Sequence, residues 1–154
     1  MDDERETAYD LLQRGRALLE ARHHAQAAIV LERADRLEPG KASILEALGP
    51  AYFNSGQHER ARAAFERLLE LDPSSHYAHF ALGQSLKRLG RRDEAGTHLR
   101  LAVALDPHST TYRDALARLG SPRPGRGASS APKHRMEPPP SIGDESRAEP
   151  PPAE

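Results

Sequence analysis

Apolar side chains recur at helical spacing from residue 8 to residue 119, which places them on one face of successive α-helices. In the clearest stretch, the pattern predicts one helix at residues 42–55 and a second at residues 58–71. Gly56 suits the left-handed turn that ends the first helix. Asp72-Pro73 ends the second, because the residue before a proline is disfavoured in the helical conformation. The stretch is therefore predicted to be two helices joined by a short turn.

This helix pair is one of several copies. Four residue types recur in a single register, each three times at steps of 34 residues, which chance does not explain. A unit of this length is a helix pair that must stack on its neighbours to hide its apolar face. We therefore predict an all-α solenoid of three helix-turn-helix repeats, at residues 8–41, 42–75 and 76–109. The residues in register are Pro39, Pro73 and Pro107; Gly15, Gly49 and Gly83; Ala27, Ala61 and Ala95; and Leu37, Leu71 and Leu105.

A shorter amphipathic helix is predicted after the third repeat, at residues 110–119. Its polar side carries Arg113, Asp114 and Arg118. A stack of helix pairs leaves its last apolar surface bare unless another element covers it. We therefore expect this helix to cap the solenoid. Its apolar side is formed by Tyr112, Ala115, Leu116 and Leu119.

Composition changes sharply at Gly120. Residues 121–154 contain 9 of the 13 prolines, and their only large apolar side chains are Met136 and Ile142. Such a segment cannot bury enough surface to offset its ordering entropy, so residues 120–154 are predicted to form a disordered, proline-rich tail. Prolines recur in triplets at 138–140 and 150–152. Triplets of this kind can dock into aromatic grooves or act as spacers, and both interpretations stay open.

The overall composition narrows the functional class. The net charge is -1 and the pI is about 6.7, so the basic footprint of a nucleic-acid-binding protein is missing. Absence of cysteine excludes disulfides, thiol catalysis and cysteine-ligated metals. The acidic start differs from a secretory signal, and the longest apolar run, residues 27–31, is too short to cross a bilayer. We expect a cytoplasmic protein that does not contact a membrane.

The residues in register resemble those of the tetratricopeptide repeat family, which has the same period. Two departures occur: Arg14 in the first repeat and His79 in the third stand where the family has large apolar residues. Arg22 also replaces the turn glycine in the first repeat. The resemblance covers about two-thirds of the chain. It is most complete in the second repeat, at Leu45, Leu48, Gly49, Tyr52, Ala61, Phe65 and Pro73.

The resemblance implies a right-handed superhelix with an inner groove that binds peptides or helices of other proteins. In this family the first helix of each repeat lines the groove, so its residues not used for packing are the candidate partner-binding residues. Phe53 and Phe80 could anchor a partner or pack one helix against the next, and both interpretations stay open. The candidates are Tyr9, Leu12, Arg16, Ser43, Glu46, Pro50, Phe53, Asn54, Tyr77, Phe80, Gln84, Lys87 and Arg88.

Two further features refine this prediction. Some family members hold the C-terminal tails of chaperones with a polar and basic clamp, but here Leu12, Ala47, Tyr77 and Ala81 occupy clamp positions, which argues against that role. Pro50 lies within a predicted helix, where it removes one hydrogen bond. It either kinks the helix and exposes a carbonyl to the groove or is a tolerated substitution.

No catalytic or metal-binding motif emerges. His76 and His79 are close in sequence, but we expect His98, on the second helix of that repeat, to face outward, and nothing completes a ligand set. The sequence contains no nucleophile motif and no phosphate-binding loop. We therefore predict a monomeric, non-enzymatic adaptor that binds an unidentified protein or peptide without cofactor or metal. The alternative is a scaffold that self-assembles by stacking repeat ends.

Overall fold

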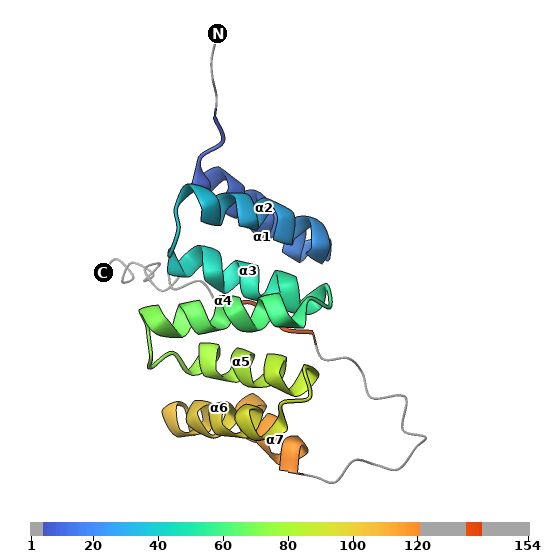
Figure 1. The fold of residues 1–154 in the computed structure, drawn as a ribbon, viewed down its shortest axis with the longest axis vertical. Coiled ribbons are helices and arrows are strands. Elements are labelled where there is room, and N and C mark those ends of the chain that lie inside the picture. Colours follow the sequence, from blue (N-terminus) through green and yellow to red (C-terminus); the bar gives the residue numbers. More distant parts are fainter. Residues whose placement is uncertain (1–4, 121–134, 140–154) are drawn as a thin grey trace, which may run out of the picture.

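The computed structural model describes residues 5–120 and 135–139 of the chain, and within these ranges the regular elements are seven α-helices (Figure 1). Each predicted repeat forms two helices of 13 and 14 residues, and an 11-residue helix follows them. The helices are α1 (Ala8–Glu20), α2 (His24–Leu37), α3 (Ala42–Asn54), α4 (His58–Leu71), α5 (His76–Arg88), α6 (Arg92–Leu105) and α7 (Thr110–Gly120).

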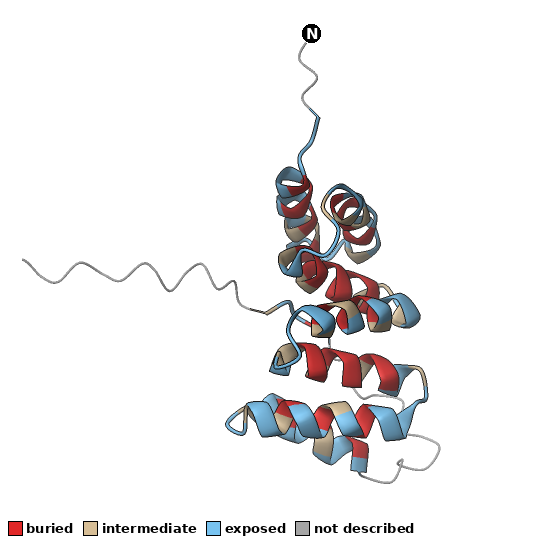
Figure 2. Ribbon diagram, turned by 60° about the vertical axis from the view of Figure 1, so that its left-hand side comes forward, coloured by how far each residue is buried: buried red, intermediate tan, exposed pale blue. Residues whose placement is uncertain are grey.

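The helices stack in chain order along the long axis of the molecule (Figure 1). Within each repeat the two helices pack against each other, and α2 contacts α3 as α4 contacts α5. Buried residues occur in helices along the whole stack (Figure 2), and most of the buried apolar ones form a single hydrophobic cluster. The all-α solenoid of helix-turn-helix repeats predicted from the 34-residue register is therefore confirmed. No helix among the described residues is long and apolar enough to span a membrane.

Turns between the helices of a repeat use left-handed backbone. Gly56 and Gly90 have φ angles of 81° and 80°, which glycine adopts without steric cost. Arg22 takes the equivalent position in the first repeat with a φ of 64°. This conformation is unfavourable for a residue with a Cβ, at a cost of about 1–2 kcal/mol. The repeat geometry thus imposes the same turn where the sequence lacks the glycine.

Close helix crossings explain the glycines that keep the repeat register. Gly15 lies against Leu31, Gly49 against Phe65, and Gly83 against Leu99. At Gly83, an added Cβ would lie 2.8 Å from Leu99 Cγ and 3.2 Å from the Ala95 carbonyl oxygen. Since Leu99 and Ala95 are fully buried, neither can move aside. Each repeat therefore has a helix crossing at which only glycine fits without displacing the side chain on the second helix.

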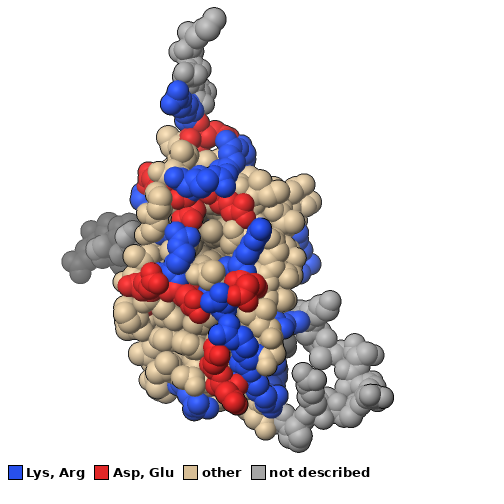
Figure 3. Space-filling model, viewed as in Figure 1, with Lys and Arg blue, Asp and Glu red and all other residues tan. Residues whose placement is uncertain are grey.

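Polar contacts join the first repeat to the second. The Arg67 guanidinium on α4 donates two hydrogen bonds to Asp35 on α2, at 2.7 and 2.9 Å. The Tyr52 hydroxyl on α3 donates to Glu32 on α2 at 2.6 Å, and burial raises the pKa of that hydroxyl. On the face shown in Figure 3, basic and acidic side chains are interspersed. Surface charge on this face therefore links neighbouring helices.

Helix α7 covers the open end of the stack. It packs against α6, with Tyr112, Ala115 and Leu119 buried and Leu116 half-buried against the core. The Tyr112 ring also lies 4.9 Å from that of Phe80 on α5, and its hydroxyl is 2.8 Å from Nδ1 of His76. The helix extends to Gly120, one residue beyond the predicted cap.

The first prediction concerns the helix crossings. Gly83→Ala should lower the free energy of unfolding by about 1–3 kcal/mol, because overpacking at the Leu99 contact outweighs the better helix propensity of alanine. Gly96→Ala is the matched control on α6, since its Cβ would meet mainly the flexible Arg100 side chain at 3.2 Å. The control should be neutral or stabilising. Urea denaturation of both variants measures the difference, and equal stabilities would contradict close packing at Gly83.

The second prediction concerns the cap. A chain ending at Ser109 should be less stable than one ending at Gly120 by at least about 2 kcal/mol, because it exposes the apolar surface that Tyr112 and Leu119 cover. It should also associate as its concentration rises. Thermal melting and light scattering test both effects. A chain ending at Ser109 that stays monomeric and equally stable would show that α7 is not a cap.

Candidate groove for an extended peptide

An extended segment from the tail lies against the first helices of the repeats. Residues 135–139 cross the stack at the level of α3 and α4 (Figure 1). They border side chains of α1 and α3 on one side and of α5 and α7 on the other. These four helices therefore line a groove, and the segment occupies its middle. We expected residues 120–154 to be disordered; the structure places these five, and the remaining residues from 121 onward lie outside the described ranges.

Asn54 binds the backbone of this segment with both ends of its amide. Its Nδ2 donates to the Met136 carbonyl at 2.7 Å, and its Oδ1 accepts from the Met136 N–H at 3.0 Å. Asn54 is the last residue of α3, where the helix end leaves its side chain room to project into the groove. A paired donor and acceptor of this kind satisfies the main chain of any non-proline residue in an extended peptide. The contact therefore fixes the position of a peptide without reading its sequence.

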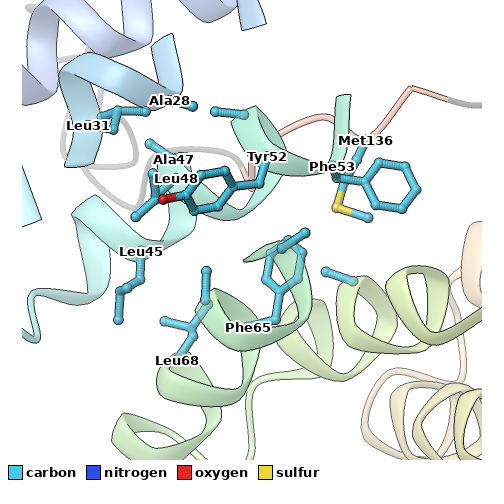
Figure 4. Packing of buried hydrophobic residues seen from close by; sticks show 14 of the residues in the cluster. Ala28, Leu31, Leu45, Ala47, Leu48, Tyr52, Phe53, Phe65, Leu68 and Met136 are labelled. Carbon is cyan, nitrogen blue, oxygen red and sulfur yellow. The ribbon is translucent and has the colours of Figure 1, made fainter. Parts of the chain in front are cut away.

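The Met136 side chain supplies the apolar part of the contact. It is 4% exposed and belongs to the same hydrophobic cluster as the repeat core. Figure 4 shows its thioether beside the Phe53 ring of α3. Methionine is unbranched and polarisable, which suits it to irregular apolar gaps and to contact with an aromatic ring. Phe53 thus contacts both the repeat core and the groove occupant.

Tyr77 of α5 adds a third hydrogen bond to the segment. Its hydroxyl donates to the Glu137 carbonyl oxygen at 3.1 Å. The ring is held edge-on to Phe65, with centroids 6.2 Å apart, so its direction is fixed by the repeat core. Burial raises the pKa of the Tyr77 hydroxyl well above its ordinary value. The hydroxyl therefore remains a hydrogen-bond donor over the physiological pH range.

Two cavities flank the segment. The first, of about 390 Å³, lies between α1 and α3 and is bordered by Arg16 and Glu46. Burial raises the pKa of the Glu46 carboxyl, and the nearby Arg16 opposes that shift. The second, of about 480 Å³, lies between α5 and α7 and has aromatic walls. Those walls are Tyr77, Phe80 and Tyr112, which face Pro138 and Pro139 of the segment.

A smaller cluster surrounds Phe53 at the edge of the groove. The Arg88 guanidinium lies 5.6 Å from the centre of the Phe53 ring, and His58 meets that ring edge-on at 5.0 Å. Burial lowers the pKa of His58, and the Arg88 charge adds to the effect. Burial likewise lowers the pKa of His24, with Arg135 of the segment contributing. Both histidines are thus favoured in the neutral form beside the groove.

The candidate residues from the sequence take four kinds of position. Arg16, Glu46, Asn54, Tyr77, Phe80 and Gln84 border the two cavities or bond the segment, together with Ser43. Leu12 and Pro50 are buried in the repeat core, and α3 continues unbroken through Pro50. Phe53 is buried beneath Met136 and beside Arg88. Tyr9, 67% exposed, and Lys87, also exposed, border neither cavity.

Sequence reasoning missed two contributors to the groove. The segment at residues 135–139 was assigned to a disordered tail, although Met136 is one of only two large apolar residues there. Tyr112 was assigned to the cap alone, yet it also forms part of the second cavity. An isolated large apolar residue next to a proline triplet was the available signal. That signal could indicate that the segment docks, but not which surface of the protein it docks against.

His98 does not face outward as we expected. Its Nδ1 lies 3.1 Å from Nδ1 of His79, and the two rings stack with centroids 5.4 Å apart. His79 Nε2 is 2.9 Å from the Pro73 carbonyl oxygen, so this ring nitrogen donates a hydrogen bond there. Burial lowers the pKa of His98, with His79 adding to the effect. Among the described residues, no three His, Asp or Glu side chains gather in a way that could hold a metal ion.

Comparison with known proteins agrees with this architecture. Residues 46–110 match a family model described as tetratricopeptide repeat. A search of curated proteins gave no significant match to the sequence.

Several solved structures share the fold. The first repeat domain of Spaghetti (RPAP3), bound to the HSP90 peptide SRMEEVD, superposes with a TM-score of 0.69 at 17% identity, covering 73% of this chain and 90% of that one. The Sgt2 domain from Aspergillus fumigatus superposes with a TM-score of 0.67 at 19% sequence identity. The match covers 82% of this chain and 91% of that one. MamA from Desulfovibrio magneticus superposes with a TM-score of 0.73 at 22% sequence identity. The match covers 75% of this chain and 66% of that one. Residues 46–110 thus match the tetratricopeptide repeat family, and the solved structures show that the chain has the fold of such repeat domains.

Proposed function

We propose that this protein is a non-enzymatic interaction module that binds an extended peptide of a partner protein in the groove of α1, α3, α5 and α7. The observation that carries the proposal is the Asn54 amide, which already holds the backbone of an extended segment by two hydrogen bonds. Main-chain hydrogen bonds supply affinity in such modes of recognition, and side-chain pockets supply specificity. The Phe53 surface under Met136 and the aromatic second cavity are pockets of this kind.

The Spaghetti complex supports a peptide as the ligand. Its bound peptide, SRMEEVD, contains the order Arg-Met-Glu, and residues 135–137 of this chain have the same order. The two domains share a fold, and their grooves are compatible with an extended ligand. Because Tyr77 occupies a position expected to be polar or basic in a chaperone-tail clamp, we do not extend the likeness to chaperone binding. We propose a cytoplasmic, monomeric adaptor without cofactor.

The third prediction tests the groove directly. In a full chain that carries Met136→Asp, so that its own segment does not compete for the groove, a synthetic, fluorescently labelled peptide of residues 131–143 should bind saturably, as measured by anisotropy; the variants below are made in this background. Asn54→Ala should weaken binding at least about tenfold, because both backbone hydrogen bonds are lost. Tyr77→Phe should weaken it less, by about two- to tenfold, since it removes one hydrogen bond and keeps the ring.

Gln57→Ala is the matched control for Asn54→Ala. The Gln57 side chain lies in the next turn and bonds Ser55 and Arg60. This variant should bind the peptide as the parent does, and melting temperatures should show that all variants are folded. If Asn54→Ala left the affinity for the peptide unchanged, the peptide would bind at a site other than the groove. Absence of saturable binding would overturn the proposed function, and ordered oligomers in light scattering would favour a self-assembling scaffold.

A further inference from the structure

The groove is occupied by the chain itself. Three backbone hydrogen bonds hold residues 136 and 137, and the Met136 side chain is almost fully buried. No other described residue outside the helical domain is buried. The contact therefore has the two components of a peptide complex, an ordered main chain and an apolar anchor.

We propose that residues 135–139 are an internal ligand of the groove, which an external peptide must displace before it can bind. This proposal rests on the function proposed above and adds a regulatory element to it. The external ligand that the site fits is an extended peptide with methionine, or another apolar residue of similar volume such as leucine, at the position of Met136. A following proline would suit the aromatic second cavity.

The chemistry of the segment fits this role. Met136 contacts Phe53 through a side chain that adapts to the gap. Pro138 and Pro139 line the second cavity together with Tyr77, Phe80 and Tyr112, and because they have no backbone N–H they bring no unpaired donor there. Prolines also hold the segment extended before it docks, which reduces the entropy lost on binding. Arg135 and Glu137 are exposed, so their charges remain in water, and they form an ion pair with each other at 4.0 Å.

The connection to the domain is long enough for binding within one molecule. Helix α7 ends at Gly120, and fourteen residues separate it from Arg135. Fifteen extended residue steps reach at most about 50 Å, whereas a 13-residue helix is about 20 Å long. A tethered ligand of this length acts at an effective concentration of about 1 mM. If the untethered segment binds the open groove with a dissociation constant of about 10–100 μM, its tethered form would weaken the binding of any competing peptide by about 100- to 10-fold.

Amide hydrogen exchange tests whether the groove is filled in solution. In the full chain, the Met136 amide should exchange at least about tenfold more slowly than in the free 131–143 peptide, because it donates to Asn54 Oδ1. Asn54→Ala should remove the protection, and Gln57→Ala should preserve it. Protection should be the same at 10 μM and 500 μM protein. Unprotected Met136 would overturn the proposal, and so would protection that falls on dilution, which would mean that the tail of a second copy fills the groove.

Competition tests the regulatory effect. The labelled 131–143 peptide should bind full-length Met136→Asp at least about tenfold more tightly than the parent, because a buried carboxylate cannot replace the thioether and the internal ligand is released. Met136→Leu is the matched control and should bind the peptide about as the parent does. Adding Asn54→Ala to Met136→Asp should abolish the gain.

The outcomes separate the two proposals. Equal binding by the parent and by Met136→Asp would overturn the internal ligand and leave the peptide-binding function standing. No binding by either chain would overturn the peptide-binding function itself.

Discussion

The close crossing of two helices in each repeat determines the rest of this structure. A glycine on the first helix meets a large apolar residue on the second, as Gly83 meets Leu99, and that side chain leaves no room for a Cβ at the glycine position. Because this contact recurs at the same position in each repeat, the repeats stack with one geometry. The first helices then lie side by side as a wall. The groove is a consequence of that wall, since its residues come from helices that do not follow each other directly in the chain.

The groove combines a rigid and an adaptable part. Tyr77 is oriented by Phe65, and Asn54 stands at the end of a helix fixed by the buried Phe53 and Tyr52. These groups present hydrogen-bonding atoms in fixed directions, which reduces the ordering cost of binding. Met136, opposite them, adapts to the surface through its unbranched side chain, while the prolines hold the segment extended. A rigid receptor with an adaptable occupant is a physical basis for exchanging one extended segment for another.

Charge has a secondary role. The bidentate contact between Arg67 and Asp35 joins neighbouring repeats, but both side chains are partly exposed, so water screens them and their net contribution is about 0–1 kcal/mol. The neutral state of the two histidines near the groove results from burial and not from ion pairing, because burial is the main cause that lowers the pKa of His24 and His58. Apolar packing therefore decides stability in this molecule, while polar groups decide orientation.

The sequence by itself determined the repeat architecture, because close helix crossings and helix ends demand particular residues. Gly83 and Gly90 could be assigned before the structure for that reason. It did not determine burial. Leu37 and Leu71 keep the same register yet are about half exposed, and Arg22 adopts a glycine-like turn. The tertiary structure alone decided that Met136 lies against Phe53, 83 positions earlier. Local sequence patterns indicate where helices begin, end and cross, because those features depend on residues close together in the chain. Docking of a distant segment depends on a surface that exists only once the helices have stacked.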